Sequence, residues 1–265
     1  MKRKGSIFGC LFLALFLIMA VPALADDQRM LEDEMREANQ RIIDFMLKNN
    51  TVHVDYVKIE AAEELMNAMS LSRSFDTPDA MRMDIEPYKI HEGIILDGYP
   101  SHILIYPDGS FGVLIIKDYT INDDGTRTLL EAASSEIAVL SNGTLFFRQT
   151  FSGTGRQSRE IQYRTLGVNL GLTTVFNVTP ATHSITYIDC FATGFIMGGI
   201  LNSATSRLVG QATGVRVFVR GDYNFNLAGI FGGTQSVINK EIAIDEFNGW
   251  PGFTIIGRIS GFLGL

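Results

Sequence analysis

Turn-forming residues recur at short intervals from about residue 90 onward, between runs of β-branched and aromatic residues. The turns are Pro107-Asp108-Gly109-Ser110, Asn122-Asp123-Asp124-Gly125 and Ser141-Asn142-Gly143. Turns of this kind reverse the chain within a few residues, so the strands that flank them pair antiparallel. The pattern predicts a mainly β (α+β) protein in which an antiparallel β meander forms a barrel or sandwich.

Apolar side chains alternate along the segments between the turns, as they do in strands with one buried face. After Ser110, one face holds Phe111, Val113, Ile115, Tyr119 and Ile121. The clearest alternation later in the chain sets Val215, Val217 and Val219 against Arg216, Phe218 and Arg220. Strands are predicted at residues 101–106, 144–151, 160–166, 173–178, 184–191, 214–220, 241–247 and 252–259.

The segment before the meander has a helical period instead. Between Asp26 and Asn50, the apolar residues Leu31, Met35, Ala38, Ile42 and Phe45 recur at spacings of four, three, four and three. This stripe predicts one long helix that packs on its own domain and stops at Asn49-Asn50. A strand at 51–59, a second, short helix at 60–70 and a loop at 73–87 are predicted to follow.

The first 25 residues have the three parts of a signal peptide: basic Met1-Lys2-Arg3-Lys4, an apolar run from Ile7 to Val21, and Ala23-Leu24-Ala25. We expect cleavage near Ala25 and a periplasmic or secreted protein. The 22 Lys and Arg and 29 Asp and Glu of the chain give −7, and loss of the signal leaves 19 against 29, a charge of −10. An acidic chain disfavours nucleic acid and anionic membrane surfaces as partners. Of two cysteines, Cys190 alone remains, so no internal disulfide is expected.

A Gly- and Ser-rich stretch, residues 152–158, is the best candidate for an internal boundary. It separates residues 26–155, the helices and first hairpins, from residues 156–265, which are richer in Gly and Phe. The second region either forms its own unit or completes the same barrel or sandwich.

Residues 41–152 resemble the VirK family of exported bacterial proteins. The resemblance rests on Arg41 to Phe45, Thr51 to Lys58, Ile105 to Ser110, Tyr119 to Gly125 and Leu140 to Phe146. A cysteine that often follows the residue matching Lys58 is Ile59 here, and the last 110 or so residues have no counterpart. The resemblance implies export and an association with virulence, and it implies no biochemical activity.

Reactive constellations are absent from the sequence. His183 and Cys190 lie seven residues apart on a predicted strand, hence on opposite faces, and Cys190 is expected to be a small buried hydrophobe. His53 and Asp55 share one face of the strand predicted at 51–59, and a polar solvent-facing side explains them without a metal.

Glycine-rich and acidic turns also have ordinary explanations. A partial calcium-loop pattern of Asn122, Asp124, Gly125 and Glu131 has Thr120 where the first acid belongs, so a hairpin turn is expected. Gly153-Thr154-Gly155 and Gly198-Gly199 lack the phosphate-loop context and are expected to be turns. No catalytic, cofactor-binding or metal-ligating residue is therefore predicted, and no cofactor.

The function that these observations favour is binding rather than catalysis, with a small hydrophobic ligand or an envelope component as partner. A barrel or sandwich interior could be lined by five phenylalanines, Phe176, Phe191, Phe195, Phe218 and Phe231. Three alternatives remain: a secreted effector-like protein that binds a host or envelope protein, a hydrolase with a site assembled from distant acids, and an outer-membrane β-barrel. Alternation through Phe253, Ile255, Gly257 and Ile259 is compatible with the last.

Overall fold

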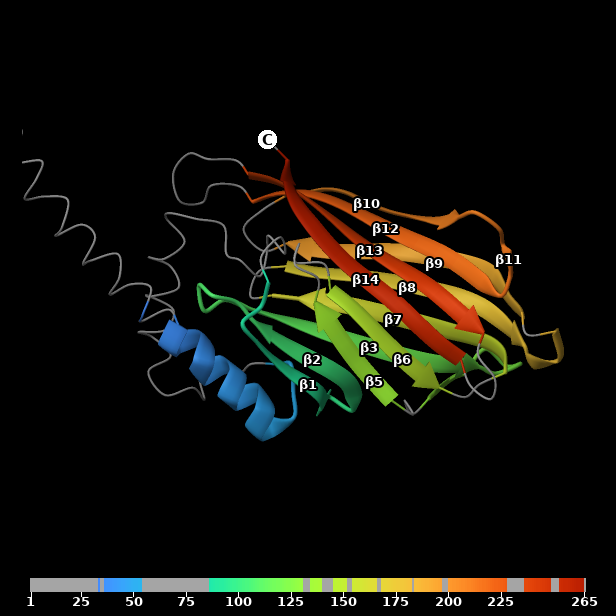
Figure 1. The fold of residues 1–265 in the computed structure, drawn as a ribbon, viewed down its shortest axis with the longest axis horizontal. Helices are drawn as coiled ribbons and strands as arrows, with labels where there is room; N and C mark the ends of the chain where they lie inside the picture. Colours follow the sequence, from blue (N-terminus) through green and yellow to red (C-terminus); the bar gives the residue numbers. More distant parts are fainter. Residues whose placement is uncertain are drawn as a thin grey trace, which may run out of the picture.

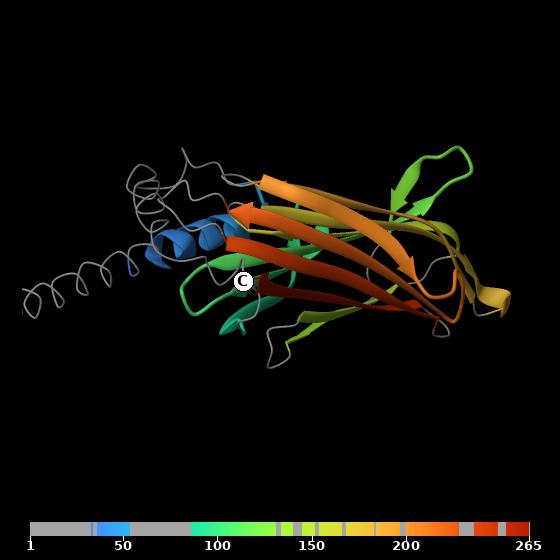
Figure 2. The same ribbon diagram turned by 90° about the horizontal axis from the view of Figure 1, so that it is seen from above.

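The structure is a computed structural model that describes residues 33, 36–53, 86–130, 134–139, 145–151, 154–165, 168–182, 184–196, 200–227, 236–248 and 253–264. Two antiparallel sheets account for most of these residues and face each other (Figures 1 and 2). The prediction of a mainly β, antiparallel fold is confirmed. The signal peptide, the short helix at 60–70 and the turn at 141–143 lie outside the described residues.

The larger sheet has the strand order β1-β2-β3-β7-β8-β9-β11, and β4 pairs with the far end of β3. Its strands are β1 (Lys89–Leu96), β2 (Tyr99–Ile105), β3 (Phe111–Ile121), β4 (Arg127–Leu129), β7 (Gly155–Arg164), β8 (Val168–Thr179), β9 (Ser184–Ile196) and β11 (Thr213–Gly214). A single 3-10 turn, η2 (Pro180–Thr182), joins β8 to β9. We call this the eight-stranded sheet.

The smaller, six-stranded sheet has the order β10-β12-β13-β14-β6-β5. Its strands are β5 (Ser134–Val139), β6 (Leu145–Phe151), β10 (Ile200–Val209), β12 (Arg216–Leu227), β13 (Ser236–Asn248) and β14 (Phe253–Gly264). β5 and β6 form the antiparallel hairpin expected around residues 141–143. Both sheets combine strands from either side of residues 152–158, and β7 already begins at Gly155.

The two sheets approach each other at both edges without merging into one hydrogen-bonded barrel among the described strands. On one side β10 lies along β9, and the Ser206 hydroxyl donates a hydrogen bond of 3.0 Å to the Cys190 carbonyl. On the other side β1 contacts β5. In between, the Tyr223 hydroxyl of β12 donates to the Gly171 carbonyl of β8, which ties the faces of the two sheets together.

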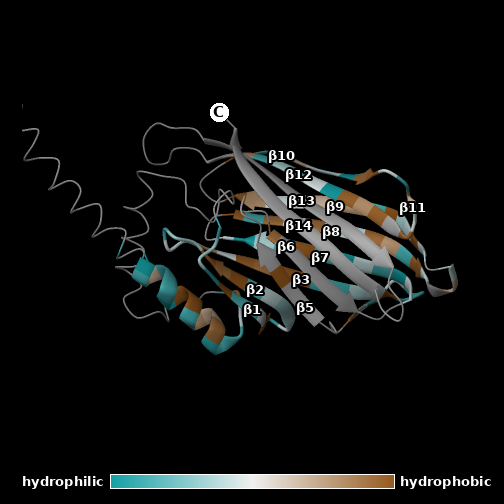
Figure 3. Cartoon of the chain, in the orientation of Figure 1, coloured by the Kyte–Doolittle hydropathy of each residue, from teal (hydrophilic) through white to brown (hydrophobic). Residues whose placement is uncertain are grey.

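The main core lies between the sheets. Inward residues of the eight-stranded sheet, such as Leu114, Ile161 and Leu172, pack with Val219 and Phe225 of β12, and all are at most 1% exposed. Val217 and Val219 are buried as the sequence predicts, whereas Val215 precedes β12 and is 57% exposed. Apolar segments of β2 and β3 are visible in Figure 3.

A second core lies on the opposite face of the eight-stranded sheet, under the helix of residues 36–49 (Figure 1). Ala38 and Ile42 are buried there, as the apolar stripe predicts, and so are Ile43 and Met46. They pack on a face of β2 and β3 that includes Phe111. Because β3 is covered on both faces here, its central residues are apolar without interruption.

Both ends of the helix are held by hairpin turns. Toward its N-terminal side, Arg36 and Asn39 donate hydrogen bonds of 3.0 Å to the carbonyls of Pro107 and Gly109. Gly109 has φ +82°, and a Cβ there would lie 2.9 Å from the Arg36 side chain, so only glycine suits the position. At its end, the helix stops at Asn50 as predicted, where φ is +50°, and the Asn50 carbonyl accepts from the Asp97 amide at 2.8 Å.

Several strands differ from the sequence prediction. Thr51 to His53 lie in no strand, because the chain here hydrogen-bonds to the β1–β2 turn through Asp97, and the rest of 51–59 lies outside the described residues. The sequence also predicted no strand at the positions of β1, β4, β5 and β10. β10 is largely exposed and polar on its outer side, so its alternation is weak.

Candidate functional site

A one-residue bulge in β9 decides which of its side chains face the core. Val175 pairs with Asp189 and Phe176 pairs with Tyr187, so Ile188 is an extra residue in β9. The bulge reverses the alternation. Ile185 and Tyr187 face inward before it, whereas Cys190, Ala192 and Ile196 face inward after it.

The expected phenylalanine lining is therefore partly wrong. Phe176 is buried in the main core as predicted. Phe191 and Phe195 are on the outer face of β9, 50% and 65% exposed, because the bulge turns them away from the core. Phe218 is half-buried and alternates with the inward Val217 and Val219, so it faces outward too. Phe231 lies outside the described residues.

Cys190 is a buried free thiol in the main core, as the sequence predicts, and it accepts a hydrogen bond of 3.3 Å from the Tyr187 hydroxyl. Burial, together with that bond, raises the pKa of Tyr187. His183, its possible partner in the sequence, lies outside the described residues.

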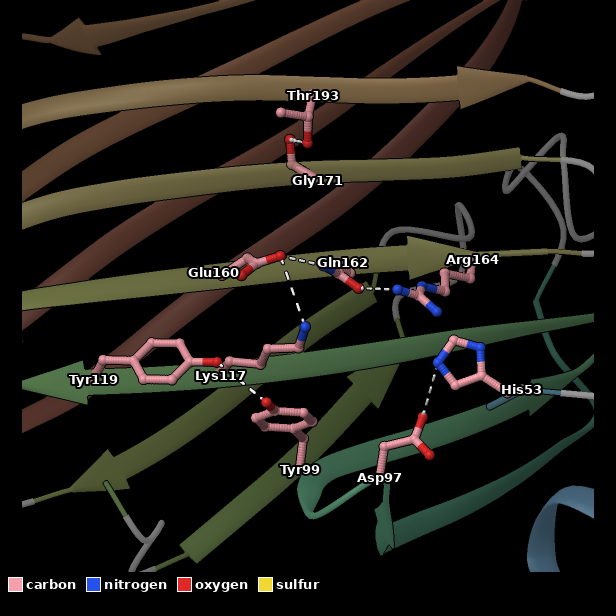
Figure 4. Close-up of polar contacts among 10 residues, drawn as sticks. All are labelled: His53, Asp97, Tyr99, Lys117, Tyr119, Glu160, Gln162, Arg164, Gly171 and Thr193. Atoms are coloured by element: carbon pink, nitrogen blue, oxygen red, sulfur yellow. Dashed lines mark hydrogen bonds and ion pairs between the residues drawn. The ribbon is translucent and has the colours of Figure 1, made fainter. Parts of the chain in front are cut away.

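The other residues considered from the sequence as metal ligands make contacts within or near their own turns. His53 is 82% exposed and lies 3.9 Å from the Asp97 carboxylate (Figure 4), while Asp55 lies outside the described residues. The Asp124 carboxylate accepts from the amide and hydroxyl of Thr126 in its own hairpin turn, and these bonds lower its pKa. Thr120, Asn122 and Gly125 belong to the same hairpin, while Glu131 lies outside the described residues.

The outer face of the eight-stranded sheet carries a polar network beside the helix-covered core (Figure 4). The Lys117 ammonium lies 3.8 Å from the Glu160 carboxylate and 4.7 Å from the centre of the Tyr99 ring. Gln162 donates to Glu160 and accepts a bond of 2.7 Å from Arg164. These side chains are partners of one another, so we interpret the network as a structural surface.

The inner face of the same strands carries a row of polar residues instead. The strand register places Asp118 of β3 opposite Arg159 of β7, Arg159 opposite Thr174 of β8, and Thr174 opposite Cys190 of β9. Directly paired residues share one face of a sheet, so the four side chains form a line across the core side. Asp118, Arg159 and Thr174 are at most 2% exposed.

The next row along the strands holds Thr120, Gln157, Phe176 and Tyr187. Gln157 is 1% exposed, and within the described part of the chain neither its amide nitrogen nor its amide oxygen has a hydrogen-bond partner. The same holds for the buried hydroxyl of Thr174. We call Asp118, Gln157, Arg159, Thr174 and Cys190 the inner polar cluster.

The charges of the cluster are paired. Arg159 donates a hydrogen bond from Nε to the Asp118 carboxylate, and both side chains are 1% exposed. Burial raises the pKa of Asp118, while the guanidinium of Arg159 opposes that shift. The guanidinium also lies 5.3 Å from the centre of the Phe176 ring, so it is held by an aromatic face as well as by a carboxylate.

The second row ends on β9 in a partly buried side chain. Tyr187 packs against the main core and yet is only partly buried, and the adjacent Ile188 at the bulge is 42% exposed. The first row therefore ends at the buried Cys190, whereas the second row is partly buried at both ends, at Thr120 and at Tyr187.

Sequence reasoning missed Asp118, Gln157, Arg159 and Thr174 as site candidates. A signal was present: Asp118 continues the period-two face of Leu114 and Ile116, and Arg159 shares that of Ile161 and Tyr163. A charged residue in register with an apolar face is unusual, because burying it costs several kcal/mol unless it is paired.

No family model, no curated protein and no solved structure matches this chain. Within the described ranges, no group of three or more His, Cys, Asp and Glu side chains is placed to hold a metal ion. No helix among these residues is long and apolar enough to cross a membrane.

Proposed function

We propose that the protein is an exported binding protein that takes up a small amphipathic molecule between its two sheets. The main support is the buried side-chain amide of Gln157, which has no hydrogen-bond partner among the described residues and lies in the row that ends at the partly buried Tyr187. Buried polar groups in proteins almost always have partners, so a group without one calls for an explanation. A ligand that enters beside Tyr187 supplies the missing partner.

The surroundings of the cluster support an amphipathic ligand. Toward the other end of the sheet, the inward face is apolar through Ile161, Leu170 and Leu172. Ligand sites typically combine such apolar walls with a few polar groups that fix orientation. The predicted signal peptide and the resemblance of residues 41–152 to the VirK family support an exported location.

Native mass spectrometry of the protein purified from its own host tests the proposal. We expect a small-molecule adduct that organic extraction removes, and a bare polypeptide would contradict it. The neutral fluorophore N-phenyl-1-naphthylamine provides a second measurement, with enhanced fluorescence expected on binding.

A matched pair of variants on β8 locates the site. Thr174 faces the core, and its neighbour Thr173 faces outward and is only partly buried. We expect T174F to abolish the fluorescence enhancement and T173F to retain it, with thermal melts showing that both are folded. Equal binding by the two variants would place the ligand elsewhere.

The outer face of β9 favours a second function, binding of an envelope or host protein. Phe191 and Phe195 are exposed there on one face, which is costly unless a partner covers them. A photo-crosslinking residue at position 191 should capture a defined protein in the native compartment, whereas one at the exposed, polar Thr205 of β10 should not. Equal capture at both positions would contradict this function.

A further inference from the structure

We infer that the inner polar cluster selects ligands whose polar end is uncharged and both donates and accepts hydrogen bonds, such as a carboxamide or an alcohol. This inference rests on the proposed function and names the chemical class of its ligand.

Gln157 presents both kinds of hydrogen-bonding group. Its side chain faces the core because it pairs with the buried Phe176 and alternates in phase with Arg159 and Ile161. A primary amide has two N–H donors and one carbonyl acceptor. Leaving both sides of a buried amide without partners costs about 1–3 kcal/mol or more, so the best ligand group satisfies both.

Thr174 lies close enough to Gln157 to share the same ligand group. It is two residues from Phe176, the direct partner of Gln157, which makes it a diagonal neighbour across β7 and β8. Diagonal neighbours in an antiparallel pair are about 7–8 Å apart, so one polar group between them can contact both side chains. The Thr174 hydroxyl adds a donor and an acceptor that also lack partners within the described residues.

The neighbouring charges disfavour an ionised ligand group. A carboxylate bound at Gln157 and Thr174 would lie near the buried Asp118, and like charges repel strongly where water is excluded. It would also only accept hydrogen bonds, which leaves the Gln157 carbonyl without a donor. An ammonium group would instead lie near Arg159, whose charge Asp118 already matches.

The apolar part of the ligand follows the inward face of β7 beyond Arg159, whose charge is paired with Asp118. From Gln157 to Tyr163 the strand advances six residues, about 20 Å at the usual rise. Ile161 and Tyr163 are fully buried along this path. We therefore expect a tail of moderate length, and a ten-carbon chain is a suitable probe.

Isothermal titration with decanamide, decanol and sodium decanoate at pH 7.5 tests the inference on the full-length protein. We expect decanamide and decanol to bind at least tenfold more tightly than decanoate. Equal or tighter binding of decanoate would overturn the inference while leaving the proposed function intact. Binding of none of the three, together with no N-phenyl-1-naphthylamine signal, would overturn the proposed function and the inference with it.

Variants assign the selectivity to the cluster. Q157L removes both hydrogen-bonding atoms at nearly constant size, and T174V removes one hydroxyl. We expect Q157L to weaken the binding of decanamide at least tenfold and to change the binding of decanoate little, so that the selectivity is lost. We expect T174V to have a smaller effect in the same direction. T173V, the outward neighbour, should bind like the wild type. Selectivity that survives in Q157L and T174V would contradict the assignment.

Discussion

Two adjacent residue pairs on β3 and β7 meet opposite environments. Lys117 and Glu160 face each other on the outer side of the eight-stranded sheet, with exposures of 15% and 25%. Asp118 and Arg159, one residue along each strand, face each other on the inner side, with exposures of 1%. The outer pair joins a network of polar side chains that contact one another. The inner pair has Gln157 and Thr174 beside it, whose polar atoms lack partners within the described residues.

This difference follows from the two-residue period of a strand. On a solvated face, two opposite charges need little desolvation, and each such pair contributes about 0–1 kcal/mol to stability. The same charges on a buried face require desolvation, so they persist only when paired and when some other requirement retains them. We attribute the outer pair to surface structure and the inner pair to ligand binding.

The largest effect is expected from breaking the inner pair. R159M leaves the Asp118 carboxylate buried without its guanidinium, and we expect a loss of about 3–5 kcal/mol in the free energy of unfolding. K117M, the matched change on the outer face, should cost no more than about 1 kcal/mol. Urea unfolding at pH 7.5 measures both.

A double variant separates charge from packing at the inner pair. D118L/R159M removes both charges together, and we expect it to recover much of the stability that R159M loses, because an apolar pair can replace a buried ion pair. If R159M and K117M lowered the free energy of unfolding equally, the inner and outer ion pairs would contribute equally to stability.

Buried and exposed histidines extend the comparison. His102 on β2 is 0% exposed, and burial lowers its pKa to about 4, whereas His53 is largely exposed. The Nδ1 atom of His102 accepts a hydrogen bond from the Gly93 amide at 3.4 Å, which requires that nitrogen to be unprotonated. Because the folded state binds a proton less readily than the unfolded chain, the stability from neutral His102 is complete above about pH 6.5. It decreases as the pH falls toward 4.

We expect this one histidine to account for about 3 kcal/mol of the stability lost between pH 7 and pH 4. Urea unfolding across this range should show a weaker pH dependence in H102N than in the wild type. An H102N variant with unchanged pH dependence would show that His102 is not protonated on unfolding.

The smallest expected effect is an increase in stability, caused by a substitution at Gln157. Q157L replaces a buried amide without partners by an apolar side chain of similar size, so we expect the ligand-free protein to gain about 1–2 kcal/mol. For a chain of this length that corresponds to an increase of a few degrees in Tm. A thermal melt of protein freed of ligand measures it. Destabilisation by Q157L would show that the amide is satisfied in the folded protein and carries no ligand.

Much of the fold could be predicted from local patterns. The turns at 107–110 and 122–125, the strand that follows Ser110 and the helical stripe through Ala38 and Ile42 all appear in the structure as expected. They are local features, because turn geometry and side-chain periods depend on residues close together in the chain. The site could not be predicted in the same way, since Asp118, Arg159 and Thr174 come from three strands.

The sequence by itself determined the class of fold: antiparallel strands joined by tight turns, and one amphipathic helix that ends at Asn50. Only the tertiary structure decided which faces are buried. The extra residue Ile188 exposes Phe191 and Phe195 and turns Cys190 inward, and the pairing of β3, β7 and β8 aligns the inner polar cluster. The physical reason is that a strand's period specifies which residues share a face, while register and packing between sheets choose the face that meets water.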